Sequence, residues 1–168
     1  GRGMDADPAP APFRLHPAAA WALVAAQFVF LILLGFLPWG SLWAREVTTI
    51  VIGLVLVALG VGIALAAGGA LGRTLTPSPI PKADGQLVTG GVYARVRHPI
   101  YSGLLVLGLG LVAIGASVLH ALAWVALLSV LMAKARFEER MLLDQYPGYR
   151  DYAARVGRLV PGIGKLRS

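Results

Sequence analysis

The chain has 168 residues, of which 57% are hydrophobic and only 14% are charged, and its mean hydropathy is +0.73. This composition excludes an ordinary soluble domain, in which about 25% of the residues are charged, and it predicts an integral membrane protein. The net charge of +7 would be compatible with a nucleic-acid partner. The basic residues instead gather at the ends of apolar segments, without interleaved aromatic residues, so we expect no nucleic acid and expect these charges to orient the protein among membrane lipids.

Residue types exclude two further kinds of site. The chain has no cysteine, which removes disulfides and thiol nucleophiles from consideration. Its three histidines, His16, His98 and His120, are too widely spaced to resemble a metal-ligand cluster, so no metal site is predicted.

The two ends of the chain are predicted to lie outside the folded domain. Residues 1–17 are rich in Ala, Pro and Asp and show no apolar periodicity, so we expect a disordered arm. Residues 1–3 precede a methionine and are interpreted as a cloning remnant. Residues 18–162 are expected to form a single membrane domain and residues 163–168 a tail, because the Pro-Gly pair at 161–162 is expected to end the ordered chain.

Four apolar runs predict an all-α membrane protein with four transmembrane helices. A helix needs about 20 apolar residues to cross a hydrocarbon core of about 30 Å. The first run could be read as a signal peptide, but it is too long and no small-residue cleavage site follows it. The predicted spans are residues 18–37, 47–67, 99–116 and 119–133.

Small residues in the second predicted span recur every four positions, at Ala58, Gly62 and Ala66. This spacing puts them on one face of a helix, where another helix could approach closely. We therefore predict a helix-packing surface at these three positions.

The last two spans are predicted to form a tight antiparallel hairpin, because only Ser117 and Val118 separate them. The fourth helix meets no helix-breaking residue before Pro147, so it should leave the bilayer and continue as a polar helix. A further short helix is predicted over residues 148–156. Its apolar residues recur with helical spacing, and we expect it to lie on the membrane surface.

The polar segment from Gly68 to His98 is too rich in Gly and Pro to cross a membrane. A loop of this length is usually functional or disordered, and the apolar residues spread along it favour order through docking. Fourteen of the 15 Lys and Arg residues fall in the N-terminal arm, in this loop or after residue 133, and the exception is Arg45. The positive-inside rule then predicts a cytoplasmic loop and two cytoplasmic termini.

The predicted hairpin brings two cationic or titratable side chains close to two carboxylates. Arg97 and His98 precede the third span, and Glu138 and Glu139 lie where the fourth helix emerges on the same side of the membrane. One interpretation is a cluster of salt bridges that clamps the hairpin. The other is a functional site, since ionisable residues at membrane depth usually have a function.

The salt-bridge interpretation draws support from two further pairs at i, i+4 spacing, Lys134 with Glu138 and Arg140 with Asp144. Exposed pairs of this kind contribute only about 0.3–0.5 kcal/mol each. They would explain a solvated helix, but they would not explain a dedicated loop of some thirty residues.

Ordered motifs over roughly residues 70–162 resemble the isoprenylcysteine carboxyl methyltransferase family, its bacterial members and the wider phospholipid methyltransferase group. Several motifs occur in the family's order and spacing, whereas the first two spans match only in character. The matching strings are Leu71-Gly-Arg, then Gly85-Gln-Leu87-Val88-Thr89-x-Gly91-x-Tyr93-x-x-Val96-Arg97-His98-Pro99-x-Tyr101-x-Gly103, then Arg136-x-Glu138-Glu139-x-x-Leu142, Tyr149-x-x-Tyr152 and Pro161.

The resemblance implies a membrane methyltransferase that binds S-adenosylmethionine under the long loop and the tail, with a tunnel to the lipid phase for its acceptor. It also implies an integral protein of the bacterial inner membrane. By motif position the cofactor-binding residues would be Leu87 and Val88 at the adenosine, Tyr93, His98 and Tyr101 around the amino-acid part, and Glu138 and Glu139 at polar groups of the cofactor. Gly91 of the same motif is also expected to bind the cofactor.

The resemblance also implies that Arg97 acts in catalysis together with Glu138 and Glu139. A guanidinium suits bidentate binding of a carboxylate, which would belong either to the acceptor or to the cofactor. Only one of the two glutamates can point fully into a pocket, since neighbours in a helix differ by about 100°. The other would orient Arg97, His98 or the tail.

The acceptor is expected to be lipid-like or otherwise membrane-partitioned, with a carboxylate, thiol or amine to be methylated. This chain is smaller than eukaryotic members of the family, so its tunnel would have fewer walls or be completed by a second subunit. Two other functions stay open at this stage. They are an NADPH-dependent reductase resembling some sterol reductases, and a non-catalytic scaffold whose basic loop binds anionic lipids.

Overall fold

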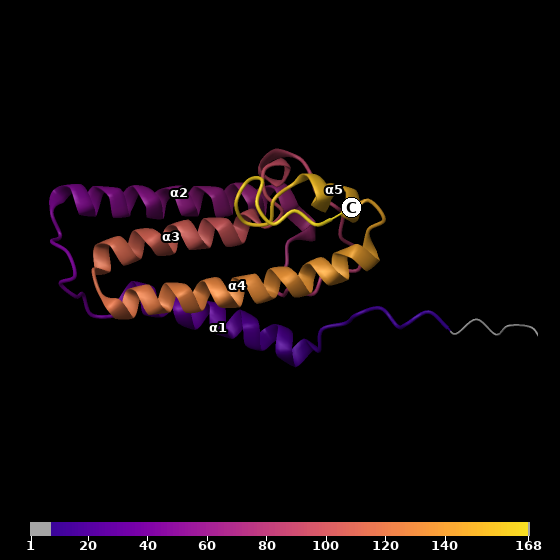
Figure 1. Cartoon of the computed structure of the whole chain (residues 1–168), viewed down its shortest axis with the longest axis horizontal. Coiled ribbons are helices and arrows are strands. Elements are labelled where there is room, and N and C mark those ends of the chain that lie inside the picture. The colour runs from indigo at the N-terminus through magenta and orange to yellow at the C-terminus, as the bar shows by residue number, and fades with distance from the viewer. Residues whose placement is uncertain (1–7, 168) are drawn as a thin grey trace, which may run out of the picture.

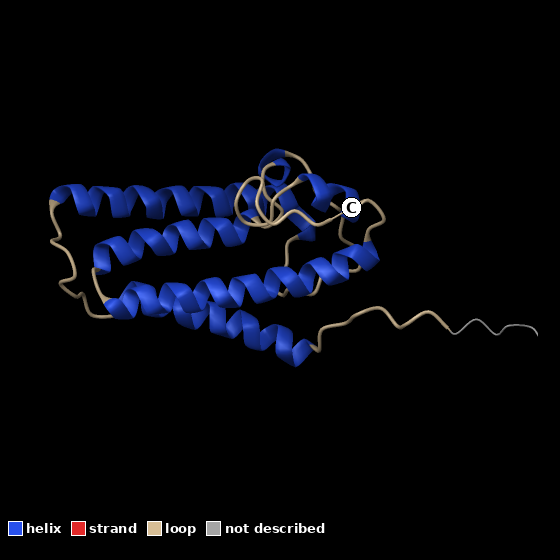
Figure 2. Cartoon of the chain, viewed as in Figure 1, coloured by secondary structure: helices blue, strands red, loops and turns tan. Residues whose placement is uncertain are grey.

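The computed structural model describes residues 8–167 and is helical. The helices are α1 (Pro17–Phe36), α2 (Val47–Leu71), α3 (Pro99–Gly115), α4 (Val118–Gln145) and α5 (Tyr149–Arg155), with short 3-10 helices at Gly72–Thr74 and Gly91–Ala94. No strand forms within the described residues, as Figure 2 shows, and one isolated parallel bridge joins Val96 to Gly157. The predicted cloning remnant and the first part of the predicted arm lie outside the described residues.

The four long helices lie side by side, with α3 between α2 and α4 and with α1 against α4 (Figure 1). The long loop after α2, helix α5 and the C-terminal segment gather at one end of these helices. Residues far apart in sequence therefore meet at that end, as the predicted topology requires.

Local sequence explains where these helices begin. Proline is the first residue of both α1 and α3, where its fixed φ and missing N–H cost nothing. The His16 side chain accepts a hydrogen bond from Ala18 N at the start of α1, and the Ser117 hydroxyl accepts one from His120 N at the start of α4. Only Ala116 and Ser117 separate α3 from α4.

Three helices are long and apolar enough to cross a membrane: α1, α2 with its 3-10 extension to Thr74, and α4. The apolar helix α3 has 17 residues, which corresponds to about 25 Å, so it is shorter than a full span. The protein is an integral membrane protein, and four complete spans remain a prediction. As predicted, α4 continues without a break beyond its apolar part, to Gln145.

Helices α2 and α3 approach each other through glycines, but not through the predicted ones. A Cβ atom added to Gly60 would lie 2.4 Å from Gly103 O, and one added to Gly103 would lie 2.6 Å from Gly60 O. Gly53 and Gly110 form the same kind of contact one heptad away. The predicted surface at Ala58, Gly62 and Ala66 was wrong, because these residues are exposed and the contacting glycines recur every seven positions.

We expect Gly60→Leu to lower the melting temperature of the detergent-solubilised protein strongly, because the new side chain would meet the α3 backbone. Overpacking of this kind typically costs about 1–3 kcal/mol or more. Gly62→Leu is the matched control, since no atom lies within 4 Å of a Cβ at Gly62. Both variants gain similar helix propensity, so equal melting temperatures would contradict the packing assignment.

Helix α5 forms where it was predicted, but its apolar face does not lie on the membrane. Tyr149, Tyr152 and Ala153 are at most 3% exposed and pack against the chain itself, including Leu87 and Leu142. The apolar spacing was read correctly, and the protein rather than lipid covers that face.

The ordered chain also extends further than the Pro-Gly pair at 161–162 suggested. Leu166 N donates to Ala153 O at 2.9 Å, and Arg158 N donates to Ile163 O at 2.8 Å. The segment after α5 therefore folds back over the helices instead of leaving them as a tail.

Orientation in the membrane is a prediction that introduced cysteines can test, because the chain has none of its own. Ala83 lies in the long loop and Ser41 lies between α1 and α2, and both are exposed. In whole cells, an impermeant thiol reagent should label the Ser41→Cys variant, while the Ala83→Cys variant should react only after the membrane is permeabilised. Labelling of the Ala83→Cys variant in intact cells would contradict a cytoplasmic loop.

Candidate functional site

A cavity of about 310 Å³ lies where the long loop and α5 meet the ends of the long helices. It is elongated along α4, because Lys134, Glu138 and Leu142 line it at successive turns, a length of about 12 Å. One end is formed by loop residues and the tyrosines of α5. The other end reaches between helices, where α1 contributes Gln27, Phe28 and Leu31.

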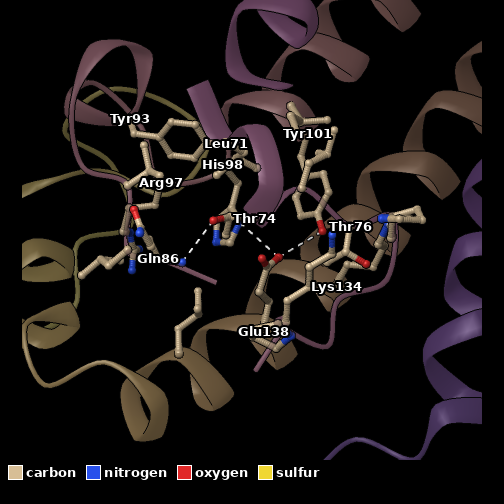
Figure 3. A pocket seen from close by; sticks show the side chains of 18 of the residues that line it. Leu71, Thr74, Thr76, Gln86, Tyr93, Arg97, His98, Tyr101, Lys134 and Glu138 are labelled. Carbon is tan, nitrogen blue, oxygen red and sulfur yellow. Dashed lines mark hydrogen bonds and ion pairs between the residues drawn. The ribbon is translucent and has the colours of Figure 1, made fainter. Parts of the chain in front are cut away.

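Glu138 occupies the middle of this cavity (Figure 3). The Tyr101 hydroxyl donates a hydrogen bond to Glu138 Oε2 at 3.1 Å, and His98 Nδ1 lies 3.6 Å from the same oxygen. The His98 and Tyr101 rings are stacked, with centroids 5.4 Å apart. Two aromatic side chains at the start of α3 thus hold this carboxylate towards the cavity.

Glu139 faces away from the cavity into a buried ionic network and is 3% exposed. Arg158 donates to both of its carboxylate oxygens, with Nε and Nη2 each 2.9 Å from one oxygen. Arg97 Nη1 lies 3.3 Å from Glu139 Oε1, and His98 Nε2 lies 3.0 Å from the same atom. One carboxylate therefore joins the start of α3, helix α4 and the segment after α5.

Arg97 is anchored by the chain that follows α5. Its backbone N donates to Gly157 O at 2.8 Å, and its side-chain Nη2 donates to Gly164 O. The Nε atom of Arg97 and the hydroxyl of Tyr149 are buried without a hydrogen-bond partner among the described residues. Both residues line the cavity, although these two atoms are themselves fully buried.

The loop-side tyrosines stay protonated at neutral pH. Burial raises the pKa of Tyr152 to about 12, although Arg97 acts in the opposite direction. Burial also raises the pKa values of Tyr93 and Tyr149, and nearby glutamates raise them further. The Tyr152 hydroxyl donates to Tyr93 O, which ties α5 to the loop.

Most of the sequence-predicted site residues come together in this cavity. Gly91 and Glu139 are the two that do not line it. Gly91 has a positive φ of 61° at the start of a 3-10 helix, so its contribution there is to the backbone turn. The predicted residues that line the cavity are Leu87, Val88, Tyr93, Arg97, His98, Tyr101 and Glu138.

Sequence reasoning missed three polar residues of the site: Gln27, Lys134 and Arg158. Lys134 was predicted to pair with Glu138 on a solvated helix face. It is instead 1% exposed, donates to Gln27 Oε1 and to Pro77 O, and lies 5.0 Å from the Tyr101 ring centroid. Gln27 could have been identified as a site residue from the sequence, because it is the one strongly polar residue of the first predicted span.

Arg140 also makes a contact different from the predicted pair with Asp144. Its guanidinium lies 3.7 Å from the ring centroid of Phe13, which in turn stacks on Phe137. Part of the predicted disordered arm therefore packs against α4, on a different face from Glu138. Among the described residues, no group of three or more His, Cys, Asp or Glu side chains could hold a metal ion.

Curated relatives match almost the whole chain. A cobalt-zinc-cadmium resistance protein of Cupriavidus metallidurans, CzcN, is 30% identical over 155 residues, which cover 90% of this chain and 67% of that protein. A nickel-cobalt-cadmium resistance protein of Alcaligenes xylosoxydans xylosoxydans, NccN, is 29% identical, covering 91% of this chain and 68% of that protein.

A solved structure supports the fold. The eukaryotic intramembrane Ras methyltransferase, an isoprenylcysteine carboxyl methyltransferase, matches with a TM-score of 0.62 and 28% identity. The match covers 92% of this chain and 56% of that protein. The model of the phospholipid methyltransferase family matches residues 48–148, which include most of the cavity wall and both glutamates. The chain therefore belongs to the phospholipid methyltransferase family of membrane methyltransferases.

Proposed function

We propose that this protein transfers a methyl group from S-adenosylmethionine to a lipid-like acceptor at the membrane. The observation that carries the proposal is the cavity itself, which extends from the long loop to the space between the membrane helices. Family membership supports methyl transfer. The chain spans only 56% of the solved methyltransferase, so the cofactor and the acceptor are inferred from the residues of this cavity.

The residues of the cavity fit the chemical parts of S-adenosylmethionine. Leu87 and Val88 offer apolar side chains for the adenosine. Arg97 and Tyr149 bring a guanidinium and a hydroxyl group to the wall at the loop end of the cavity, which suits the carboxylate of the amino-acid part. Glu138 offers a carboxylate for a cationic group.

When bound, S-adenosylmethionine supplies an electrophilic methyl group on a positively charged sulfur. The protein's contribution to such a displacement is to position the reactants and to exclude water. Aromatic faces at Tyr93 and Tyr101 would stabilise a sulfonium by cation–π contact, worth about 0.5–2 kcal/mol. An acceptor that carries a proton would also need a base, and Glu138 and His98 are the titratable groups placed for that role.

The inner end of the cavity favours an acceptor that partitions into the membrane. Phe28, Leu31 and Leu104 give this end an apolar wall between α1 and α3. Phe28 is itself 50% exposed on the outer surface of α1, so the wall adjoins the lipid-facing side of the protein. A lipid-like molecule could enter here with its polar end towards Glu138.

The scaffold hypothesis receives less support than the enzyme hypothesis. A surface that only binds anionic lipid headgroups would present its cations outwards. Arg97 is 4% exposed and Lys134 is 1% exposed, so neither side chain presents its charge on the surface. The next experiment distinguishes a reductase from a methyltransferase, because the two enzymes would bind different cofactors.

We expect S-adenosylhomocysteine to raise the melting temperature of the detergent-solubilised protein, because a ligand at 100 times its dissociation constant adds about 2.7 kcal/mol of stability. Glu138→Gln should weaken this binding more than tenfold, which corresponds to about 1.4 kcal/mol. Differential scanning fluorimetry with a ligand titration measures both quantities. Stabilisation by NADPH without stabilisation by S-adenosylhomocysteine would point to the reductase, and a response to neither would favour the scaffold.

The two neighbouring glutamates should respond differently to the same substitution. Glu139→Gln breaks a buried network of Arg97, His98 and Arg158, and losing one partner of a buried ion pair costs about 3–5 kcal/mol. Glu138→Gln removes a carboxylate that borders the cavity and should leave the unfolding free energy nearly unchanged. Denaturant titration of the two variants without ligand measures this difference.

Arg158→Gln provides the control for the network, because it removes the partner that donates to both oxygens of Glu139. The double variant of Glu139 and Arg158 should cost less than the sum of the two single changes. Additive costs, or equal costs for the two glutamate variants, would contradict the division of roles between them.

A further inference from the structure

The C-terminal loop, which we define as residues 159–163, carries two exposed apolar side chains that the cavity does not use. Val160 is 51% exposed and Ile163 is 64% exposed. Pro161 and Gly162, which lie between them, are also exposed. Neighbouring exposed apolar residues of this kind mark a contact with a membrane or with another protein.

The C-terminal loop has a defined position against the membrane helices. Its first residue, Leu159, packs against the core cluster that contains Leu105 of α3 and Leu131 of α4. The Ser102 hydroxyl, in the first turn of α3, donates a hydrogen bond to Leu159 O at 2.6 Å. The depth of this loop in the membrane can therefore be read from the helices that it contacts.

Helix α4 places the loop at the boundary between its apolar and its polar part. Residues 118–133 contain no Lys, Arg, Asp or Glu, and charged residues follow from Lys134 onward. Arg158, the residue before the loop, reaches across this boundary. Its Nη1 atom lies 3.8 Å from Met132 Sδ, and its Nη2 atom lies 2.9 Å from Glu139 Oε2. The loop thus begins at the level where α4 leaves the apolar region.

Helix α2 gives a similar depth independently. A Cβ atom added to Gly103 would lie 2.6 Å from Gly60 O and 2.9 Å from Ala64 N, so the first turns of α3 pack against this part of α2. Beyond Ala64, α2 continues to Leu71 without a charged residue, which is a distance of about 10 Å. Since α2 is about 38 Å long and a hydrocarbon core is about 30 Å thick, the loop contact lies near the edge of that core.

Cations follow the apolar tip of the loop. Lys165 and Arg167 are both exposed. Such side chains keep their alkyl stems against apolar surroundings while their charged ends reach the headgroups. An apolar tip beside cations is typical of a segment that lies between headgroups and hydrocarbon.

We propose that the C-terminal loop is a membrane anchor, with Val160 and Ile163 inserted among the lipid chains at the edge of the bilayer. The anchor also holds the ionic network of the site. Arg158 donates to Glu139 and Gly164 O accepts from Arg97, so residues directly before and after the loop bind this network. The membrane contact that periodicity predicted for α5 is thus made by the segment after it. The proposal is independent of methyl transfer, because it concerns where the loop lies and not what the cavity binds.

Spin labels on single cysteines distinguish lipid, water and protein around the loop, because the chain has no cysteine of its own. The full chain in phosphatidylcholine nanodiscs carries the label at Ile163→Cys. Leu65→Cys is the lipid-facing control at the depth of Ala64, and Ala83→Cys is the control in the exposed part of the long loop. Electron paramagnetic resonance measures collisions of each label with oxygen, which concentrates in hydrocarbon, and with a nickel chelate, which stays in water.

We expect the ratio of oxygen collisions to nickel collisions at Ile163 to match that at Leu65 and to exceed that at Ala83 about tenfold, because an apolar solute prefers hydrocarbon to water. A ratio like that at Ala83 would place the loop in water. Few collisions with either reagent would show that protein covers the loop. Either result would overturn the proposal, and Val160→Cys repeats the measurement if Ile163→Cys does not fold.

The holding role is tested with Ile163→Asp, which places a charge at the edge of the bilayer and removes little protein contact, because Ile163 is mostly exposed. In nanodiscs this variant should speed hydrogen exchange in residues 157–166 about tenfold, since local opening frees the amides of Arg158 and Leu166. Ile163→Leu is the matched control and should leave exchange unchanged. Equal exchange in the two variants would refute the anchor's role in holding the network.

Discussion

The buried carboxylate of Glu139 is the interaction on which the rest of the site depends. Its oxygens contact the side chains of Arg97, His98 and Arg158, which come from the start of α3 and from the segment after α5. An ion removed from water costs several kcal/mol unless its partners are well placed, so this network fixes three separate segments at one point. It also determines what its neighbour can do. Adjacent residues of a helix point in directions about 100° apart. Because Glu139 points into the ionic network, Glu138 faces the cavity.

A second constraint comes from the glycines between α2 and α3. Their backbones approach so closely that a methyl group at Gly60 or Gly103 would collide with the opposite helix. This contact holds the start of α3 next to the end of α2, where the long loop begins. Thr74 Oγ1 then accepts a hydrogen bond from Gln86 N at 3.1 Å, which draws the loop back over the helix ends. The cavity is thus closed by packing on one side and by ionic contacts on the other.

The sequence allowed prediction of features that depend on local rules, and it was less informative where partners are distant. Apolar runs located the four long helices, and the short connection after α3 was correctly expected to bring His98 and Glu138 together. Lys134 was misread because its i, i+4 spacing to Glu138 fitted a solvated helix as well as a buried one. Arg158 carried no local signal, since its role depends on a chain reversal after α5. For α5 the periodicity located the apolar face correctly, but periodicity does not say whether protein or lipid covers that face.

The cavity lies where a lipid-like acceptor could reach it from the membrane and a charged cofactor could reach it from water. Drawing an alkyl chain out of a bilayer costs about 0.8 kcal/mol per CH₂ group, so a chain of about a dozen carbons would cost on the order of 10 kcal/mol. A water-soluble enzyme would have to offset that cost within its own pocket. Here the apolar end of the cavity lies between membrane helices and the polar end lies under the loop and α5. A lipid-like acceptor could leave its chain in the membrane while only its polar end reaches Glu138, and a charged cofactor could approach from water. This arrangement leaves the binding energy of the acceptor's polar end free for selectivity.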